Sequence, residues 1–200
     1  MTEKPDSETL ILASSSPRRK MLLQQAGLHY RAVDPPIPEP EDIDETLSPA
    51  EHAEALAYFK ASSVDRSNDH AAIIGADTVV SVSGDILGKA PGPRQAGEML
   101  ARLSGTRHEV ITGVALLGPG HWRMIASETT YVTMRTMTPD EIDQYVQSGE
   151  WLGKAGSYAI QETGDRFVTN VEGSFSNVVG LPMELVARML NAFNMRADGV

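Results

Sequence analysis

The stretch LILASSSPRRKMLL, residues 10–23, predicts a buried strand that passes through a short turn into a helix. Leu10 to Ala13 form a brief apolar run with polar residues on both sides, which is typical of a strand inside a sheet. Ser16 supplies an N-cap hydroxyl, and Pro17 suits the first helical position because no backbone N–H is needed there. A strand followed at once by a helix is typical of α/β folds.

The helix expected to begin at Pro17 carries three cations in its first turn, Arg18, Arg19 and Lys20. Because the N-terminal end of a helix is already positive, this arrangement is unfavourable unless an anion binds there. Free backbone N–H groups, the serine hydroxyls from Ser14 onward and two guanidinium groups together suit a phosphate group. A solvated basic helix start is the alternative, and the phosphate site is the favoured interpretation.

Helical and strand patterns alternate along the rest of the sequence. Two capping boxes, Ser48-Pro49-Ala50-Glu51 and Thr138-Pro139-Asp140-Glu141, each mark the beginning of a helix. Helices are expected over 17–26, 49–64, 94–103, 139–149 and 182–193, and strands over 29–33, 71–82, 110–117 and 125–134, with further short strands before residue 180. The pattern predicts an α/β fold in which helices flank a mixed twisted sheet. We expect one domain over 9–193, with loose termini at 1–8 and 194–200.

Composition narrows the class of protein. The 200 residues include no Cys, 17 Lys and Arg and 27 Asp and Glu, so the formal net charge is −10. Absence of Cys excludes disulfides, thiolate metal sites and a cysteine nucleophile. A negative surface disfavours nucleic acid polymers, and no apolar run approaches the roughly 20 residues of a membrane helix. With a polar start unlike a signal peptide, these features predict a cytoplasmic protein without a nucleic acid or membrane partner.

Asp77 is the second candidate for chemistry, because it follows an apolar run, Ile73-Ile74-Gly75-Ala76, directly. A carboxylate emerging from a buried strand is costly unless it is paired, capped or bound to a metal. Strand ends line the ligand crevice in open α/β sheets, which would place Asp77 in a site. A turn aspartate that bonds its own backbone is an equally good explanation of this motif alone.

Several familiar sites are excluded by spacing. Gly84 to Ala90 resembles a phosphate-binding P-loop, but three residues separate its glycines where four are required, and Ala90 replaces the magnesium-binding Ser or Thr. Lys89 can still approach a phosphate from an ordinary loop. The five histidines include no i, i+4 pair, so a histidine zinc site is not expected. The acidic loop around Glu39 reads as solvated, although one of its carboxylates could reach a metal.

The ordered set of motifs resembles the Maf family, septum-formation inhibitor proteins that act as nucleoside triphosphate pyrophosphatases. The resemblance covers about residues 9–190 and rests on segments in consistent order, namely 12–19, 75–78, 88–89, 103–105, 154–158, Gln161 and 179–182. Gly75-Ala76-Asp77-Thr78 would be a weak signal alone, whereas the ordered set is specific.

The resemblance implies a mixed α/β fold with two lobes around a deep nucleotide-binding cleft. It also implies a homodimer and a divalent cation, Mg²⁺ or Mn²⁺, with hydrolysis of a triphosphate to the monophosphate and pyrophosphate. By matching position, Asp77 would be the catalytic base and a metal ligand, with Glu39 near the metal. Arg19, Lys60 and Lys89 would contact the phosphates.

Base preference is the remaining expectation, and the resemblance implies that Arg18, Thr78 and Gln161 distinguish the family's pyrimidine branch from its 7-methyl-GTP branch. The Gln161 amide offers a donor and an acceptor that match the imide edge of uracil or thymine. dTTP and UTP are therefore the expected substrates, in a house-cleaning role with a possible link to cell-division arrest. A 7-methyl-GTP pyrophosphatase and a nucleotide-binding division regulator without turnover are the alternatives.

Overall fold

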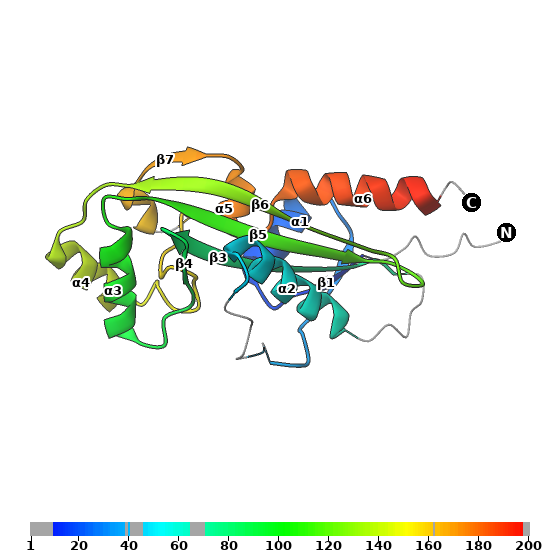
Figure 1. The fold of residues 1–200 in the computed structure, drawn as a ribbon, viewed down its shortest axis with the longest axis horizontal. Coiled ribbons are helices and arrows are strands. Elements are labelled where there is room, and N and C mark those ends of the chain that lie inside the picture. The colour runs from blue at the N-terminus through cyan, green and yellow to red at the C-terminus, as the bar shows by residue number, and fades with distance from the viewer. Residues whose placement is uncertain (1–9, 39, 41–45, 65–70, 162, 198–200) are drawn as a thin grey trace.

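The computed structural model describes residues 10–38, 40, 46–64, 71–161 and 163–197. Seven strands form one mixed sheet in the order β2-β1-β3-β5-β6-β7, with β4 paired to β3 outside this path (Figure 1). The strands are β1 (Leu10–Ala13), β2 (Tyr30–Val33), β3 (Ile73–Val82), β4 (Asp85–Leu87), β5 (Arg107–Leu117), β6 (Arg123–Met134) and β7 (Val168–Glu172). The predicted mixed α/β class is confirmed.

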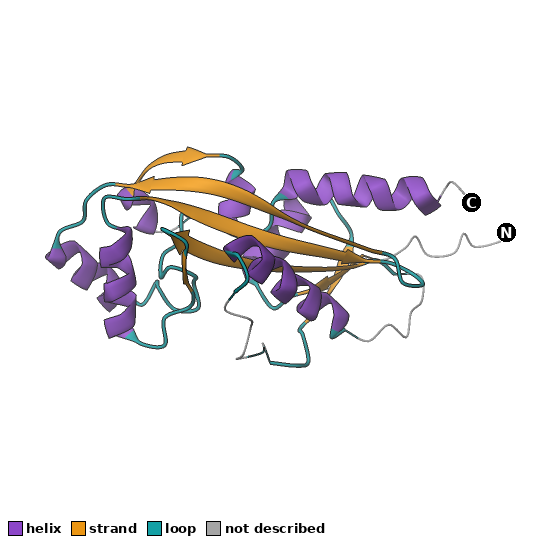
Figure 2. Ribbon diagram, in the orientation of Figure 1, coloured by secondary structure: helices purple, strands orange, loops and turns teal. Residues whose placement is uncertain are grey.

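The helices lie on both faces of this sheet (Figure 2). They are α1 (Pro17–Gln25), α2 (Pro49–Ser62), α3 (Pro93–Leu103), α4 (Pro139–Ser148), α5 (Phe175–Val179) and α6 (Met183–Ala197), with a 3₁₀ turn at Thr163–Phe167. Helix α2 packs on one face of β3 and β5, while α1, α5 and α6 pack on the opposite face. Helices α3 and α4 pack together at one end of the molecule, where Leu100, Leu103 and Tyr145 are buried.

The edge of β3 that faces β1 is only partly paired. Strand β1 runs parallel to β3 and ends at Ala13, which pairs with Gly75. Strand β4 pairs with the same strand from Val80 onward. Within the described part of the chain, no strand pairs with this edge of β3 at residues 76–79. This short segment is therefore not covered by a strand at that edge, and two of its residues, Asp77 and Thr78, line a cleft.

Two glycines set the distance between α2 and the sheet. A Cβ atom at Gly75 would collide with the backbone of Ala57 and would lie 2.8 Å from the backbone nitrogen of Ala61. A Cβ atom at Gly113, on β5, would collide with the backbone of Ala53. Because neither position carries a side chain, α2 lies almost in backbone contact with β3 and β5.

Local signals in the sequence account for the helix starts. Both capping boxes form, with Ser48 accepting from the Glu51 backbone and Thr138 from the Glu141 backbone while each glutamate bonds back. The hydroxyl of Ser16 caps α1 as predicted, and Pro17 occupies its first turn. The predicted stop at Gly27 is confirmed by its positive φ of 70°.

The C-terminal part of the sequence differs from expectation. The stretch before residue 180 contains a 3₁₀ turn, the single strand β7 and the short helix α5, rather than a series of short strands. Ser174 begins α5 by capping the backbone of Asn177. Helix α6 continues to Ala197, so residues 194–197 are helical where a loose terminus was expected. No glycine or proline interrupts residues 194–197, which removes a reason for the helix to end at Phe193.

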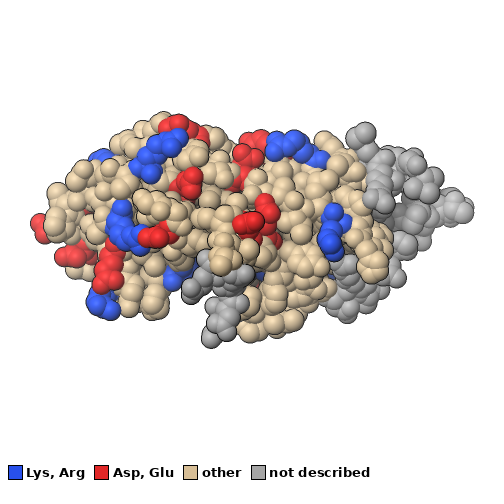
Figure 3. All heavy atoms as spheres, viewed as in Figure 1, with Lys and Arg blue, Asp and Glu red and all other residues tan. Residues whose placement is uncertain are grey.

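Charge on the surface is mixed. On the face seen in Figure 3, acidic and basic side chains are interspersed over the sheet and the helices. None of the helices in the described part of the chain combines the length and apolar character that crossing a bilayer requires.

Candidate active site

A cleft of about 530 Å³ lies along the open edge of β3. Both halves of the molecule contribute to its walls, from the β1–α1 turn and α2 on one side to the segment 152–158 on the other. Among the described residues that line it, five carry a cationic side chain and Asp77 alone carries a carboxylate. The five cations are Arg18, Arg19, Lys60, Lys89 and Lys154. The cleft therefore suits a strongly anionic ligand.

Asp77 lies within β3 rather than at its end. It reaches the cleft because the neighbouring strand β1 stops at Ala13, two residues short of the position that would cover Asp77. The sequence predicted a carboxylate at a strand end, and the strand that ends is its neighbour. The consequence for the site is the same, since the carboxylate borders an open strand edge.

The carboxylate of Asp77 forms a buried ion pair with Lys60. The Lys60 Nζ lies 2.5 Å from the Asp77 Oδ1, and each side chain is 9% exposed. The pair follows from the glycine contact described above: Gly75 and Asp77 point to the same face of β3, and α2 lies on that face. A buried carboxylate needs such a partner, because an isolated charge out of water is strongly disfavoured.

Arg19 approaches the opposite face of β3. Its Nε donates to the carbonyl oxygen of Gly180 at 2.8 Å, and its Nη2 donates to the Thr78 hydroxyl at 3.2 Å. Its Nη1 donates to the Ser14 hydroxyl at 3.4 Å. Three of the five guanidinium N–H groups are thus fixed by protein oxygens, so the cation is held in a defined orientation beside the cleft.

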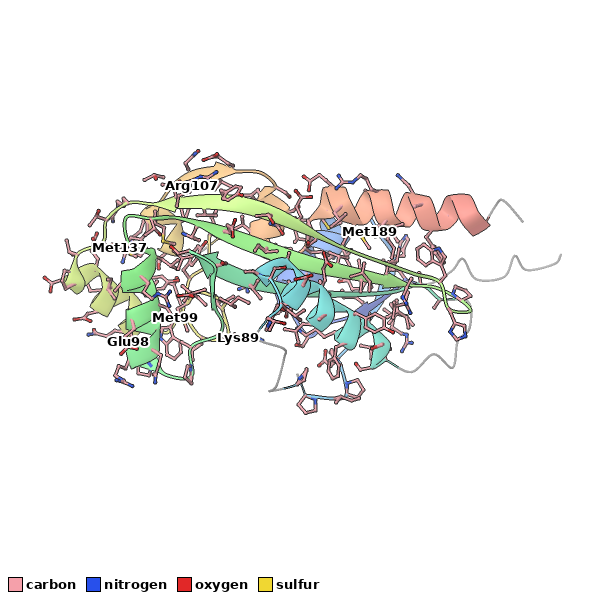
Figure 4. The ribbon with its side chains drawn as sticks, in the orientation of Figure 1. Lys89, Glu98, Met99, Arg107, Met137 and Met189 are labelled. Carbon is pink, nitrogen blue, oxygen red and sulfur yellow. The ribbon has the colours of Figure 1, made fainter. Side chains whose placement is uncertain are left out.

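The segment 152–158 brings a cation that sequence reasoning did not single out. Lys154 is buried and lines the cleft. Lys89 lies between β4 and α3 (Figure 4). It forms an isolated antiparallel bridge with Ala155. The backbone N–H of Gly156 donates to the carbonyl oxygens of Leu87 and Gly88, which ties the two segments together. Lys154 lies in the segment 154–158, one of those on which the family resemblance rests. Its burial beside the other cations depends on the fold and is not visible in the sequence.

One predicted residue, Gln161, is not brought into this group. Gln161 is exposed and is not among the residues that line the cleft, although its neighbour Ile160 is. Glu39 lies outside the described residues, as do Glu41, Asp42, Asp44 and Glu45. The structure does gather Ser14, Arg18, Arg19, Lys60, Asp77, Thr78 and Lys89 around one cleft.

A neutral residue, Tyr158, forms part of the far wall and is paired with a buried histidine. The ring of His108 is buried, and its Nε2 lies 2.8 Å from the Tyr158 hydroxyl. Burial lowers the pKa of His108 from 6.5 to about 4, and burial raises the pKa of Tyr158. Both groups are therefore uncharged at neutral pH. This part of the cleft, with Val80 and Val110 beside it, suits an uncharged portion of a ligand.

Comparison with known proteins fits this arrangement. The family model for the Maf-like protein matches residues 9–193. The chain belongs to the Maf family. A dTTP/UTP pyrophosphatase of Bacillus pumilus is 44% identical over 93% of this chain and 97% of its own length. A protein of the same name from Ruminiclostridium cellulolyticum is 43% identical over 92% of this chain and 96% of its own.

Among solved structures, the Staphylococcus aureus Ham1 protein aligns with a TM-score of 0.43 at 17% identity, over 64% of this chain and 72% of that one. This likeness is too distant to bear on function. The Maf relatives, by contrast, match nearly the whole domain, including the segments that form the cleft.

Proposed function

We propose that this Maf-family protein is an enzyme that hydrolyses dTTP and UTP to the monophosphate and pyrophosphate. One observation carries the proposal: a single buried carboxylate borders a cleft whose described lining includes five cationic side chains. A triphosphate brings about four negative charges, so binding and cleaving it is mainly a problem of charge neutralisation and positioning. The relatives named above carry dTTP/UTP pyrophosphatase as their names.

Each residue has a role that follows from its place in the cleft. The phosphate oxygens are bound by Arg19, which its three protein contacts orient, and by the lysines across the cleft. Lys60 is placed to contact phosphate while still facing Asp77. Asp77 accepts a proton from the attacking water at its carboxylate. The water oxygen bonds to the α-phosphorus, the bond from that phosphorus to the bridging oxygen breaks, and pyrophosphate leaves.

A divalent cation, Mg²⁺ or Mn²⁺, fits this cleft as a partner of the substrate. No group of three or more His, Cys, Asp or Glu side chains forms a metal cage among the described residues. Mg²⁺ commonly uses one or two carboxylates and takes its other oxygens from substrate phosphates and water. Asp77 lines the cleft and would supply such a carboxylate. Glu39, which lies outside the described residues, is the candidate second ligand that the family resemblance implies. When bound, the cation would neutralise charge that develops on the phosphates.

The preference for a pyrimidine base is proposed from the relatives' names and from the residues Arg18, Thr78 and Gln161. The amide of Gln161 can both donate to and accept from the imide edge of uracil or thymine, whereas a carboxylate could only accept. A mismatched buried polar group costs about 1–3 kcal/mol, so preferences of roughly tenfold to a hundredfold are expected. Since Gln161 is exposed in this structure, its contact with a base requires the segment beyond Ile160 to turn toward the cleft.

The deciding experiment compares kcat/KM of the purified protein for UTP, dTTP, GTP and 7-methyl-GTP with Mg²⁺ or Mn²⁺, scored by pyrophosphate release. Fastest turnover of UTP and dTTP supports the proposal. Fastest turnover of 7-methyl-GTP would assign the protein to the other branch of the family. Binding of these nucleotides without pyrophosphate release would indicate a nucleotide-binding regulator.

The setting of the enzyme is also proposed. We infer a homodimer in the cytoplasm with a house-cleaning role, from the family resemblance. Light scattering after size-exclusion chromatography measures the oligomeric state directly. A mass equal to one chain of 21.6 kDa would contradict the dimer.

A further inference from the structure

A buried threonine outside the cleft lies directly behind the Arg19 contact. Thr112, on β5, is completely buried and pairs across the sheet with Thr78. The two hydroxyl oxygens lie 2.9 Å apart. Thr112 Oγ1 also lies 3.2 Å from the backbone carbonyl oxygen of Asn177, on α5. The chain of contacts therefore runs from Arg19 through Thr78 and Thr112 to α5.

The direction of each hydrogen bond in this series of contacts can be assigned by counting donors. Each hydroxyl has one proton, and a backbone carbonyl can only accept. If Thr112 donates to Asn177, then Thr78 donates to Thr112 at 2.9 Å and accepts from Arg19. The reverse order would require Thr78 to donate to the Gly180 carbonyl oxygen at 3.5 Å, and it would leave the Thr112 and Asn177 oxygens facing each other without a proton. The first order makes the shorter bonds and is favoured.

We infer that Thr112 is a positioning residue for triphosphate binding, because its hydroxyl accepts the Thr78 proton and so holds Thr78 as an acceptor for Arg19. This inference rests on the proposed function, in which Arg19 binds phosphate. Thr78 then contributes to substrate binding through Arg19 and not by donating to a phosphate, since its proton is already used. The arrangement also ties the orientation of Arg19 to α5, which follows β7 in the chain and packs on the same face of the sheet as α1.

Replacing Thr112 with valine removes the acceptor for the Thr78 proton and hardly changes the shape of the side chain. Valine has the same branching as threonine but no hydroxyl. In Thr112→Val, the next acceptor for the Thr78 proton is the Gly180 carbonyl oxygen, which already accepts from Arg19 Nε at 2.8 Å. That oxygen can accept a second hydrogen bond, but it lies 3.5 Å from the Thr78 hydroxyl, so the hydroxyl must shift to reach it and its contact with the guanidinium weakens. Loss of one neutral hydrogen bond predicts about three- to tenfold weaker phosphate binding.

The test measures the binding of inorganic tripolyphosphate by calorimetry, together with KM and kcat for UTP. Thr112→Val should weaken tripolyphosphate binding and raise the KM by about three- to tenfold, with kcat changed by less than about twofold. Thr112→Ser keeps the hydroxyl and should bind tripolyphosphate within about twofold of the wild type.

Thr130→Val is the matched control. Thr130, on β6, is also completely buried, and its hydroxyl bonds with Ser174 and the side chain of Asn177. These hydrogen bonds join Thr130 to Ser174 and Asn177 and not to Thr78 or Arg19, so Thr130→Val should lower the melting temperature without weakening tripolyphosphate binding. In an Arg19→Ala background, Thr112→Val should have no further effect on binding.

Four outcomes would overturn the inference: equal loss of binding in both valine variants, no loss in Thr112→Val, a loss that persists without Arg19, or no binding of tripolyphosphate by the wild type. Failure of the proposed function has a different signature. In that case the wild-type protein binds tripolyphosphate but releases no pyrophosphate from any nucleotide, and the comparison of the variants by calorimetry still decides the role of Thr112.

Discussion

Asp77 and Thr78 are neighbours in sequence, yet the two faces of β3 support them by different physical means. On the face covered by α2, one ion pair between Lys60 and Asp77 is shielded from water. On the other face, neutral oxygens orient Arg19, and the buried hydroxyl of Thr112 lies behind its contact with Thr78. A charged partner is needed where the carboxylate is buried, whereas neutral hydrogen-bonding groups are enough to orient a guanidinium beside the cleft. The following variants test this difference.

Asp77→Asn should have the largest effect on turnover. The amide keeps the size of the side chain but cannot accept a proton from water at neutral pH. We expect hydrolysis of UTP to fall by ~10²–10⁴-fold, while nucleotide binding stays measurable. Single-turnover kinetics with calorimetry separates the two quantities. A variant that retains most of its turnover would show that Asp77 is not the base.

Lys60→Met should have the largest effect on stability, because it leaves the Asp77 carboxylate buried without its cation. Removal of one partner of a buried ion pair typically destabilises the fold by about 3–5 kcal/mol. Chemical denaturation measures the loss. The double variant Lys60→Met with Asp77→Asn should recover much of it, since no uncompensated charge remains. Equal stability of the single and double variants would argue against this account.

Arg19→Ala should act on binding more than on folding, because the protein oxygens that orient it, from Gly180, Ser14 and Thr78, are neutral and the cation itself lines the cleft. Hydrogen bonds to charged groups contribute roughly 1.5–3 kcal/mol, so triphosphate binding should weaken about tenfold or more. Binding of the unphosphorylated nucleoside should change little. An equal loss for both ligands would indicate a folding defect instead. Arg94→Ala, which alters an exposed arginine on α3, is a matched control.

His108→Gln should make the free energy of unfolding depend less on pH in the acidic range. The folded protein holds the pKa of His108 at about 4, below its ordinary 6.5. Between these values the unfolded chain binds a proton that the folded protein does not, so stability falls as the pH falls from 6.5 toward 4. The contribution is on the order of 2 kcal/mol. Denaturation at pH 7 and pH 4.5 measures it, and an unchanged difference in the variant would contradict it.

The sequence predicted those parts of the fold and site that depend on local chemistry. The sequence indicates the capping boxes at Ser48 and Thr138 and the apolar run before Asp77. These features depend only on residues that are close in the sequence. The cations of the β1–α1 turn were assigned to a phosphate site for the same reason. The resemblance supplied Lys60, which the local pattern did not indicate, and it favoured Lys89, for which the loop alone left a phosphate contact open.

Contacts between distant segments could not be read in this way. The 2.5 Å approach of Lys60 to Asp77 depends on how α2 lies on the sheet. The sequence around Lys154 is that of an ordinary loop. Its segment lines the cleft, where Ala155 forms a bridge with Lys89. The bond between Thr112 and Thr78 depends on the register of β3 against β5, and no local pattern encodes it.

The near-contact of α2 with β3 and β5 has a consequence for how this protein can vary over evolutionary time. At Gly75 and Gly113 even one added methyl group would push the helix backbone away from the sheet. Such a shift would carry Lys60 away from Asp77, so the buried ion pair would be lost at the same time as the packing of α2 on the sheet. Divergence in substrate choice is therefore expected at the rim, where Ile37 and Leu152 are exposed and line the cleft. The two glycine positions are expected to resist change even while the rim diverges.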